Sequence, residues 1–154
     1  MPYPRFSNLD VECWEHAGKL GFAIPTVCLY HAKVEFGRPI LAAINELIAE
    51  PAPSKRILTF KATPRKKSFA TMRLLLVEPR EDLRVMRFCF EPGTVSIEMT
   101  SAGLAVLHDG VAAWCDGAED FRIHSRRAKL KKHELGSLDK SCGEIWFWGP
   151  TMEP

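Results

Sequence analysis

The chain contains no long run of apolar residues. A helix that crosses a bilayer needs about 18 or more consecutive residues of this kind, and the longest candidate here is the short stretch of residues 74–77. The first six residues, Met-Pro-Tyr-Pro-Arg-Phe, also lack the apolar segment of a secretory signal. We therefore expect a cytoplasmic protein with no membrane segment.

The motifs that commonly carry catalysis or cofactor binding are also missing. The sequence has no His-Glu-x-x-His, no Gly-x-Ser-x-Gly, no Gly-x-x-x-x-Gly-Lys and no dinucleotide-binding glycine pattern. Its five histidines are not spaced as metal ligands are. We predict a protein that is not an enzyme and that uses no metal or cofactor, while a site assembled from residues distant in the sequence remains open.

The cysteines form no recognisable framework. They are Cys13, Cys28, Cys89, Cys115 and Cys142, and no two of them form a Cys-x-x-Cys pair. An odd and scattered set is typical of buried thiols in a reducing compartment. We expect buried, unpaired thiols.

What is present is the composition of a globular protein. Of the 154 residues, 46% are apolar and 26% are charged, and a chain of this length can build one core without disulfides. We predict a single domain over residues 1–154, with a core of residues 25–149 and a tail of residues 150–154. Residues 1–24 include a mixed segment, residues 9–20, that fits either a short helix or an arm.

Residues 26–36 alternate in polarity and predict a long, half-buried strand. The set expected to face the core is Cys28, Tyr30, Ala32, Val34 and Phe36, and the opposite set is Leu29, His31, Lys33 and Glu35. Pro39 then suits the first turn of a helix of about 11 residues, which Pro51 and Pro53 prevent from continuing.

Four short segments rich in β-forming residues follow, residues 56–62, 72–77, 83–90 and 94–99. Turn residues separate them, which predicts a meander of antiparallel strands. A second helix follows, capped by Thr100 or Ser101 and closed by Gly117 in a left-handed conformation. Two strands complete the chain, near Phe121 and at residues 144–148. We predict an α+β fold, with one antiparallel sheet of about five to seven strands and two main helices packed on one of its faces.

Basic residues are concentrated in two stretches that contain no acidic residue. The stretch 55–73 holds Lys55, Arg56, Lys61, Arg65, Lys66, Lys67 and Arg73, and the stretch 122–132 holds Arg122, Arg126, Arg127, Lys129, Lys131 and Lys132. Together they could form a phosphate-binding surface for nucleic acid. They could equally be solvated loops, because the net charge of the chain is only +2.

An aromatic run closes the last strand. In a strand, Trp146 and Trp148 point to one face and Phe147 to the other. At least one of these faces should be core, but on an exposed face the two tryptophans would be strong anchors for a partner. We select Arg126, Arg127, Trp146 and Trp148 as candidate binding residues, since arginine and tryptophan are over-represented at interaction hot spots.

The last 60 or so residues carry a family resemblance. The segment Val95-Ser96-Ile97-Glu98-Met99-Thr100, the residues Gly103, Leu104, Leu107, Trp114, Gly117 and Asp120-Phe121, and the stretches 135–139 and 141–149 resemble small bacterial proteins that include immunity proteins of polymorphic toxin systems. The resemblance implies a non-catalytic protein that binds and blocks a toxin by steric occlusion. A nucleic-acid-binding module that uses the two basic stretches is the alternative.

Overall fold

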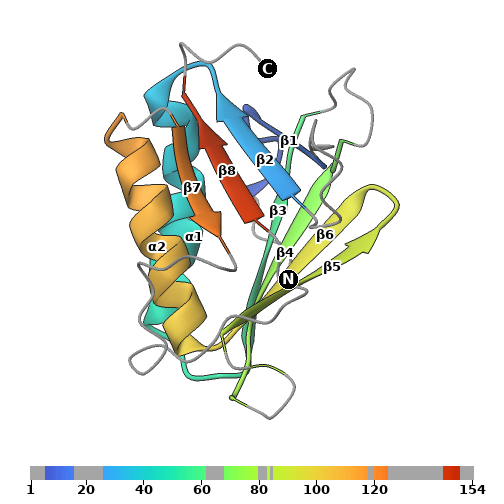
Figure 1. Ribbon diagram of the computed structural model, residues 1–154, viewed down its shortest axis with the longest axis vertical. Coiled ribbons are helices and arrows are strands. Elements are labelled where there is room, and N and C mark those ends of the chain that lie inside the picture. The colour runs from blue at the N-terminus through green and yellow to red at the C-terminus, as the bar shows by residue number, and fades with distance from the viewer. Residues whose placement is uncertain are drawn as a thin grey trace.

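The computed structural model describes residues 6–15, 26–61, 68–79, 83, 85–117, 120–124 and 144–149, and of residues 120–124 it describes the backbone. Within these ranges the chain forms strands and two α-helices, with four consecutive strands between the helices (Figure 1). In chain order the elements are β1 Val11–Glu15, β2 Thr26–His31, the 3₁₀ helix η2 Val34–Gly37, α1 Arg38–Ile48, β3 Ser54–Thr59, β4 Thr71–Leu76, β5 Met86–Glu91, β6 Thr94–Met99, α2 Ser101–Cys115, β7 Asp120–His124 and β8 Glu144–Trp148.

The strands form two sheets. Sheet I has the order β1-β2-β8-β7 and sheet II the order β3-β4-β6-β5. Both sheets are mixed, because β2 pairs with β8 and β4 pairs with β6 in parallel, while the other neighbours are antiparallel. The α+β class and the order of the elements from β2 onward are as predicted. The prediction of a single, purely antiparallel sheet is wrong.

The predicted meander fails at β6. This strand lies between β4 and β5 and pairs with both of them. A two-residue turn joins β5 to β6, and its Gly93 has a φ of +75°. An inner strand suits the sequence, since Val95, Ser96 and Ile97 are all buried although they point to alternate faces.

The two sheets meet at β1 and β3. Leu9 and Phe60 form an isolated parallel bridge, in which the Leu9 N–H donates to the Thr59 carbonyl at 3.0 Å and the Lys61 N–H donates to the Leu9 carbonyl at 3.1 Å. Residues 11–15 pair with β2 as a strand, so neither the short helix nor the arm expected within residues 9–20 describes them. Residues 16–20 lie outside the described part of the chain.

Strand β2 is shorter than predicted and presents different residues to the core. It ends at His31, and Val34–Gly37 wind into the 3₁₀ helix that leads to α1. Its core-facing side chains include Leu29 and His31, both buried, whereas Tyr30 is partly exposed on the opposite face. The alternation of polarity did not identify the core face, because β2 lies between β1 and β8 and has buried residues on both faces. Cys28, on the face opposite to the core, is also fully buried.

The two helices lie where the sequence predicts them, and α1 has the 11 residues expected. Pro39 stands in the first turn of α1, Thr100 caps α2 by accepting a hydrogen bond from the Gly103 N–H at 3.4 Å, and Gly117 follows α2 with a φ of +105°. Neither helix in the described part of the chain has the length and apolar character needed to cross a membrane.

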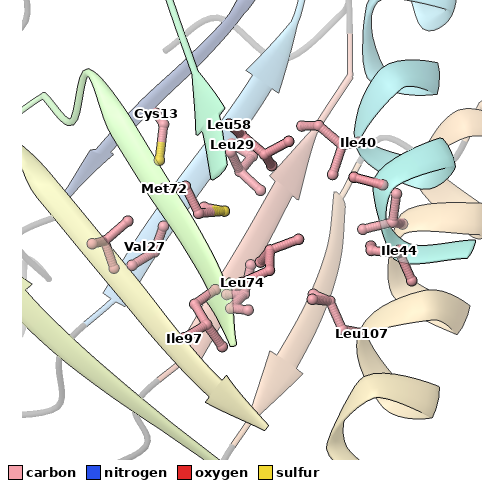
Figure 2. Packing of buried hydrophobic residues seen from close by; sticks show 14 of the residues in the cluster. Cys13, Val27, Leu29, Ile40, Ile44, Leu58, Met72, Leu74, Ile97 and Leu107 are labelled. Atoms are coloured by element: carbon pink, nitrogen blue, oxygen red, sulfur yellow. The ribbon is translucent and has the colours of Figure 1, made fainter. Parts of the chain in front are cut away.

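The two helices pack against each other and do not cover one face of one sheet. Helix α1 also contacts β3 of sheet II, while α2 contacts β7 and β8 of sheet I. They therefore close the side of the space between the sheets, and in Figure 1 they lie together along one flank of the molecule, beside β7. Figure 2 shows the resulting core, where side chains of both sheets and both helices converge.

Candidate functional site

Strand β8 separates a buried face from an exposed one. Ile145 and Phe147 have no exposed surface, and Phe147 packs against the indole of Trp114 with ring centroids 5.5 Å apart. Trp146 and Trp148 alternate with them and are both partly exposed. The two tryptophans thus lie on the face of sheet I that points away from the helices and the core, which is the exposed arrangement considered in the sequence analysis.

Two more aromatic side chains point to this face, Tyr30, which is partly exposed, and Trp14, which is buried with 7% of its surface exposed. The register pairs Cys28 with both Trp14 of β1 and Trp146 of β8, and it pairs Tyr30 with Trp148. We call Trp14, Tyr30, Trp146 and Trp148 the aromatic face. Cys28 is a small residue between large neighbours and is fully buried among them.

The three tryptophan rings of the aromatic face form two contacts. Trp14 and Trp148 meet edge to face, with centroids 5.7 Å apart and planes at 72°, and Trp146 lies 6.2 Å from Trp148. The Trp148 carbonyl accepts a hydrogen bond at 2.9 Å from the indole N–H of the fully buried Trp114. This bond ties the backbone beneath the aromatic face to the core, so the rings are held on a rigid base.

The outer face of sheet II has a different character. Register places Lys55, Ile57, Arg73, Leu75, Arg87, Cys89 and Glu98 there. Arg87 and Glu98 form an ion pair across β5 and β6 at 2.9 Å. This mixture of charged, polar and isolated apolar side chains is ordinary for a solvated sheet. The concentration of aromatic rings is therefore a property of sheet I and not of the fold in general.

The basic stretch 55–73 does not present all its charges to solvent. Arg56 is only 6% exposed, and its guanidinium donates to Glu46 at 2.9 Å and to Glu50. The hydrogen bond from Arg56 lowers the pKa of the Glu50 carboxyl. Lys61 forms an ion pair with Asp10, while Lys55 and Arg73 are exposed. Arg56 thus acts inside the fold and is not part of an exposed positive surface.

Most of the other predicted binding residues lie outside the described residues. These are Arg65, Lys66, Lys67, Arg126, Arg127, Lys129, Lys131 and Lys132. The backbone of Arg122 is described, and it stands opposite Trp146 in the pairing of β7 with β8. Of the four candidate anchors, the structure therefore places Trp146 and Trp148.

The described cysteines are thiols of low reactivity. Cys13, Cys28 and Cys115 are buried as predicted, whereas Cys89 is exposed. Burial raises the pKa of Cys13 well above its ordinary value and raises that of Cys115 to about 11. Burial and the neighbouring Glu98 raise the pKa of Cys89. A thiol with a raised pKa carries little thiolate at neutral pH and is a poor nucleophile.

The described histidines do not form an acid–base pair with a buried carboxylate. His31 is fully buried, its Nε2 lies 3.3 Å from the Trp114 carbonyl, and its Nδ1 has no hydrogen-bond partner among the described residues. His108 lies beside Asp109, whose side chain is 83% exposed. In the same part of the chain, no three side chains of His, Cys, Asp or Glu are grouped as metal ligands.

Sequence reasoning missed half of the aromatic face. Trp14 lies in the segment for which the sequence predicts a helix or an arm, and the alternation of residues 26–36 predicts that Tyr30 faces the core. The sequence Val-Glu-Cys-Trp-Glu of β1 does alternate with a period of two, which is the signal that identifies a strand.

Comparisons with protein-family models, with curated proteins and with solved structures find no match to this chain.

Proposed function

We propose that the chain is a non-catalytic protein-binding protein and that its aromatic face is the contact surface. The observation that supports this is the position of Trp146 and Trp148, which are partly exposed on the same face as the partly exposed Tyr30 and the buried Trp14. Tryptophan and tyrosine dominate interaction hot spots because they bury much area at a small cost in side-chain entropy. A specific interface of standard size buries about 1,600 Å² in total, and the outer face of sheet I would be its centre.

The specific form that we propose is an immunity protein that neutralises a bacterial toxin by steric occlusion. The resemblance on which this rests includes the stretch 141–149, which contains both exposed tryptophans. Arg126 and Arg127 follow β7 closely in the sequence and complete the proposed anchor set. Such an interface acts by covering the toxin surface and requires no chemistry from this chain.

The alternative is a nucleic-acid-binding module. One arrangement favours it, because aromatic rings on an open sheet face can stack bases, and Arg122 stands in register beside Trp146. The ion pairs of Arg56 and Lys61 count against it, since those two charges already have acidic partners within the fold. Lys55 and Arg73 are the described residues of the first stretch that would carry phosphate contacts.

The test is affinity capture from the native cells at low and high salt, using the wild type, the double variant Trp146→Ala/Trp148→Ala and a control variant, Ile57→Ala/Arg73→Ala, on sheet II. A protein partner should survive high salt and bind the wild type and the control equally. The double variant should bind it more weakly by more than about 2 kcal/mol, or about thirty-fold. Near-ultraviolet circular dichroism and unfolding curves would establish that each variant is folded.

Two results would argue against the proposal. Retention of nucleic acid at low salt alone would favour the alternative, because phosphate contacts weaken steeply with salt. A protein partner that binds the double tryptophan variant as tightly as the wild type would move the interface away from the aromatic face. For the immunity form, co-expression with the captured partner should relieve any growth defect which that partner causes, and the double variant should not.

A further inference from the structure

A groove of about 300 Å³ opens on the surface beside the β5–β6 hairpin. Three segments line it: Glu15 at the end of β1, Ser68 and Phe69 before β4, and residues 90–93 of the β5–β6 hairpin. Its volume is at the lower limit for small-molecule sites, which suits one long side chain better than a cofactor. The groove adjoins the aromatic face, because Ser68 of its lining forms an isolated antiparallel bridge with Trp14. Glu15 follows Trp14 on the other face of β1.

Backbone hydrogen bonds hold the walls of the groove together. The Phe69 N–H donates to the Cys13 carbonyl at 2.8 Å, which ties the second segment to β1. The Gly93 carbonyl accepts from the Ala70 N–H at 2.9 Å and from the Thr71 N–H at 3.2 Å, which ties the hairpin to the start of β4. A ligand would therefore enter a site that is already formed, with little loss of backbone entropy.

The lining is acidic and aromatic. Two of its residues, Glu15 and Glu91, are acidic, and none of the described residues that line the groove is basic. A carboxylate offers about four acceptor positions, so each can receive a donor from a ligand alongside contacts with its own chain. Phe69 and Phe90 contribute two rings with centroids 5.7 Å apart. The negative face of an aromatic ring attracts a cation within about 6 Å.

We infer that this groove binds a cationic side chain, an arginine or a lysine of another polypeptide. Carboxylates and phenyl rings both favour positive charge, and a guanidinium or ammonium group on an apolar stem can use both at once. A hard metal ion fits less well, because Ca²⁺ takes about six to eight oxygen ligands and the described residues provide no group of three acidic, His or Cys ligands. This inference does not depend on the proposed function.

The experiment is an NMR titration of the ¹⁵N-labelled full chain with N-acetyl-arginine amide, with N-acetyl-lysine amide and with N-acetyl-citrulline amide. Citrulline has nearly the shape of arginine without its charge. The amide signals of Ser68, Phe69, Glu91 and Gly93 should shift and saturate with both cations. Citrulline should bind at least about five-fold more weakly, as expected for the loss of an ion pair and a cation–π contact.

Three variants make the test specific. Glu15→Gln and Glu91→Gln should each weaken arginine binding by about two- to five-fold, which is the range of exposed ion pairs. Phe90→Leu should also weaken it, because it removes the ring and retains an apolar side chain. Glu35→Gln is the control, since Glu35 is an exposed carboxylate on η2 and not part of the lining.

Three outcomes would overturn the inference. The first is that citrulline binds as tightly as arginine. The second is that Glu35→Gln weakens arginine binding as much as the groove variants do. The third is that the amide signals of the groove residues do not shift. The titration uses small probes and no protein partner, so its failure would leave the proposed function standing. Conversely, loss of partner capture in the tryptophan variant would say nothing about the groove. Unchanged signals far from the groove would show that each variant is folded.

Discussion

The imidazole of His31 stacks on the indole of Trp114, with ring centroids 4.1 Å apart and planes at 21°. The two residues are 83 positions apart in the sequence and come from β2 and α2. Trp114 in turn contacts Phe147 and donates to the Trp148 carbonyl. The pair therefore connects the inner face of sheet I to helix α2 directly beneath the aromatic face.

This stacking predicts a graded loss of stability at position 31. His31→Ala should lower the free energy of unfolding by about 3 kcal/mol, since it removes a buried ring and leaves a cavity. His31→Leu should cost about 1 kcal/mol, because it fills much of the space and loses mainly the stacking. Urea unfolding of both variants would measure this. Equal losses in the two would mean that volume contributes little at this position.

Arg56 and Lys61 offer a matched comparison of a buried ion pair with an exposed one. Arg56→Ala should destabilise the fold by about 3 kcal/mol, because it removes the partner of two carboxylates and the packing of a buried stem. Lys61→Ala should cost less than about 1 kcal/mol, since both it and Asp10 are largely exposed. Denaturant unfolding at two salt concentrations would test the difference. A larger loss in the Lys61 variant would contradict the burial of Arg56.

Gly103 should not tolerate a methyl group. A Cβ there would lie 2.1 Å from the Val85 carbonyl oxygen, which also accepts from the Thr100 N–H at 3.0 Å. Gly103→Ala should therefore destabilise the fold by about 2 kcal/mol or more, although alanine is about 1 kcal/mol better than glycine in a free helix. Thermal unfolding is the measurement.

The control for this prediction is Ala105→Gly in the same helix. Ala105 is exposed, so the change should cost about 1 kcal/mol through helix propensity alone. A Gly103→Ala variant more stable than the wild type would show that the contact with Val85 gives way easily.

Substitutions at two adjacent residues of β8 should destabilise the fold to different degrees. Phe147→Ala should cost about 3–5 kcal/mol, because Phe147 is fully buried between sheet I and α2. Trp146→Ala should cost less than half as much, because its ring is partly exposed on the outer face. Urea unfolding would rank them. The reverse ranking would mean that the aromatic face is the core side of the sheet.

Cys115 should make stability fall at alkaline pH. Burial, with a smaller contribution from the Asp116 carboxylate and against the effect of Arg38, raises the pKa of this thiol from 9.0 to about 11. The unfolded chain therefore loses the proton first. The contribution of the protonated Cys115 thiol to the free energy of unfolding is complete below about pH 9 and is lost as the pH rises towards 11.

Cys115→Ser should accordingly flatten the decline of stability between pH 9 and 11, by at most about 1.4 kcal/mol per pH unit for one proton. Asp116→Asn, which removes the second cause of the raised pKa, should have a smaller effect in the same direction. Urea unfolding at unit pH steps from 8 to 11 would show this. Curves for Cys115→Ser that run parallel to the wild type would contradict it.

The local patterns of the sequence identified the elements but not always their partners. The spacing of Ile40, Ala43, Ile44 and Leu47 predicts α1, and all four are buried. Likewise, the alternation in β8 separates Trp146 from Phe147. These features depend on helical or strand periodicity, which a few neighbouring residues establish.

The sequence by itself determined the α+β class, the two helices with their cap and proline positions, and the opposite faces of Trp146 and Phe147. The tertiary structure decided the pairing of β4 with β6 and of β2 with β8, the union of the sheets at Leu9 and Phe60, and the gathering of Trp14 and Tyr30 on the aromatic face. The physical reason is that periodicity is set by neighbours along the chain. Strand order and register are set by contacts between distant segments, whose side chains must share one core.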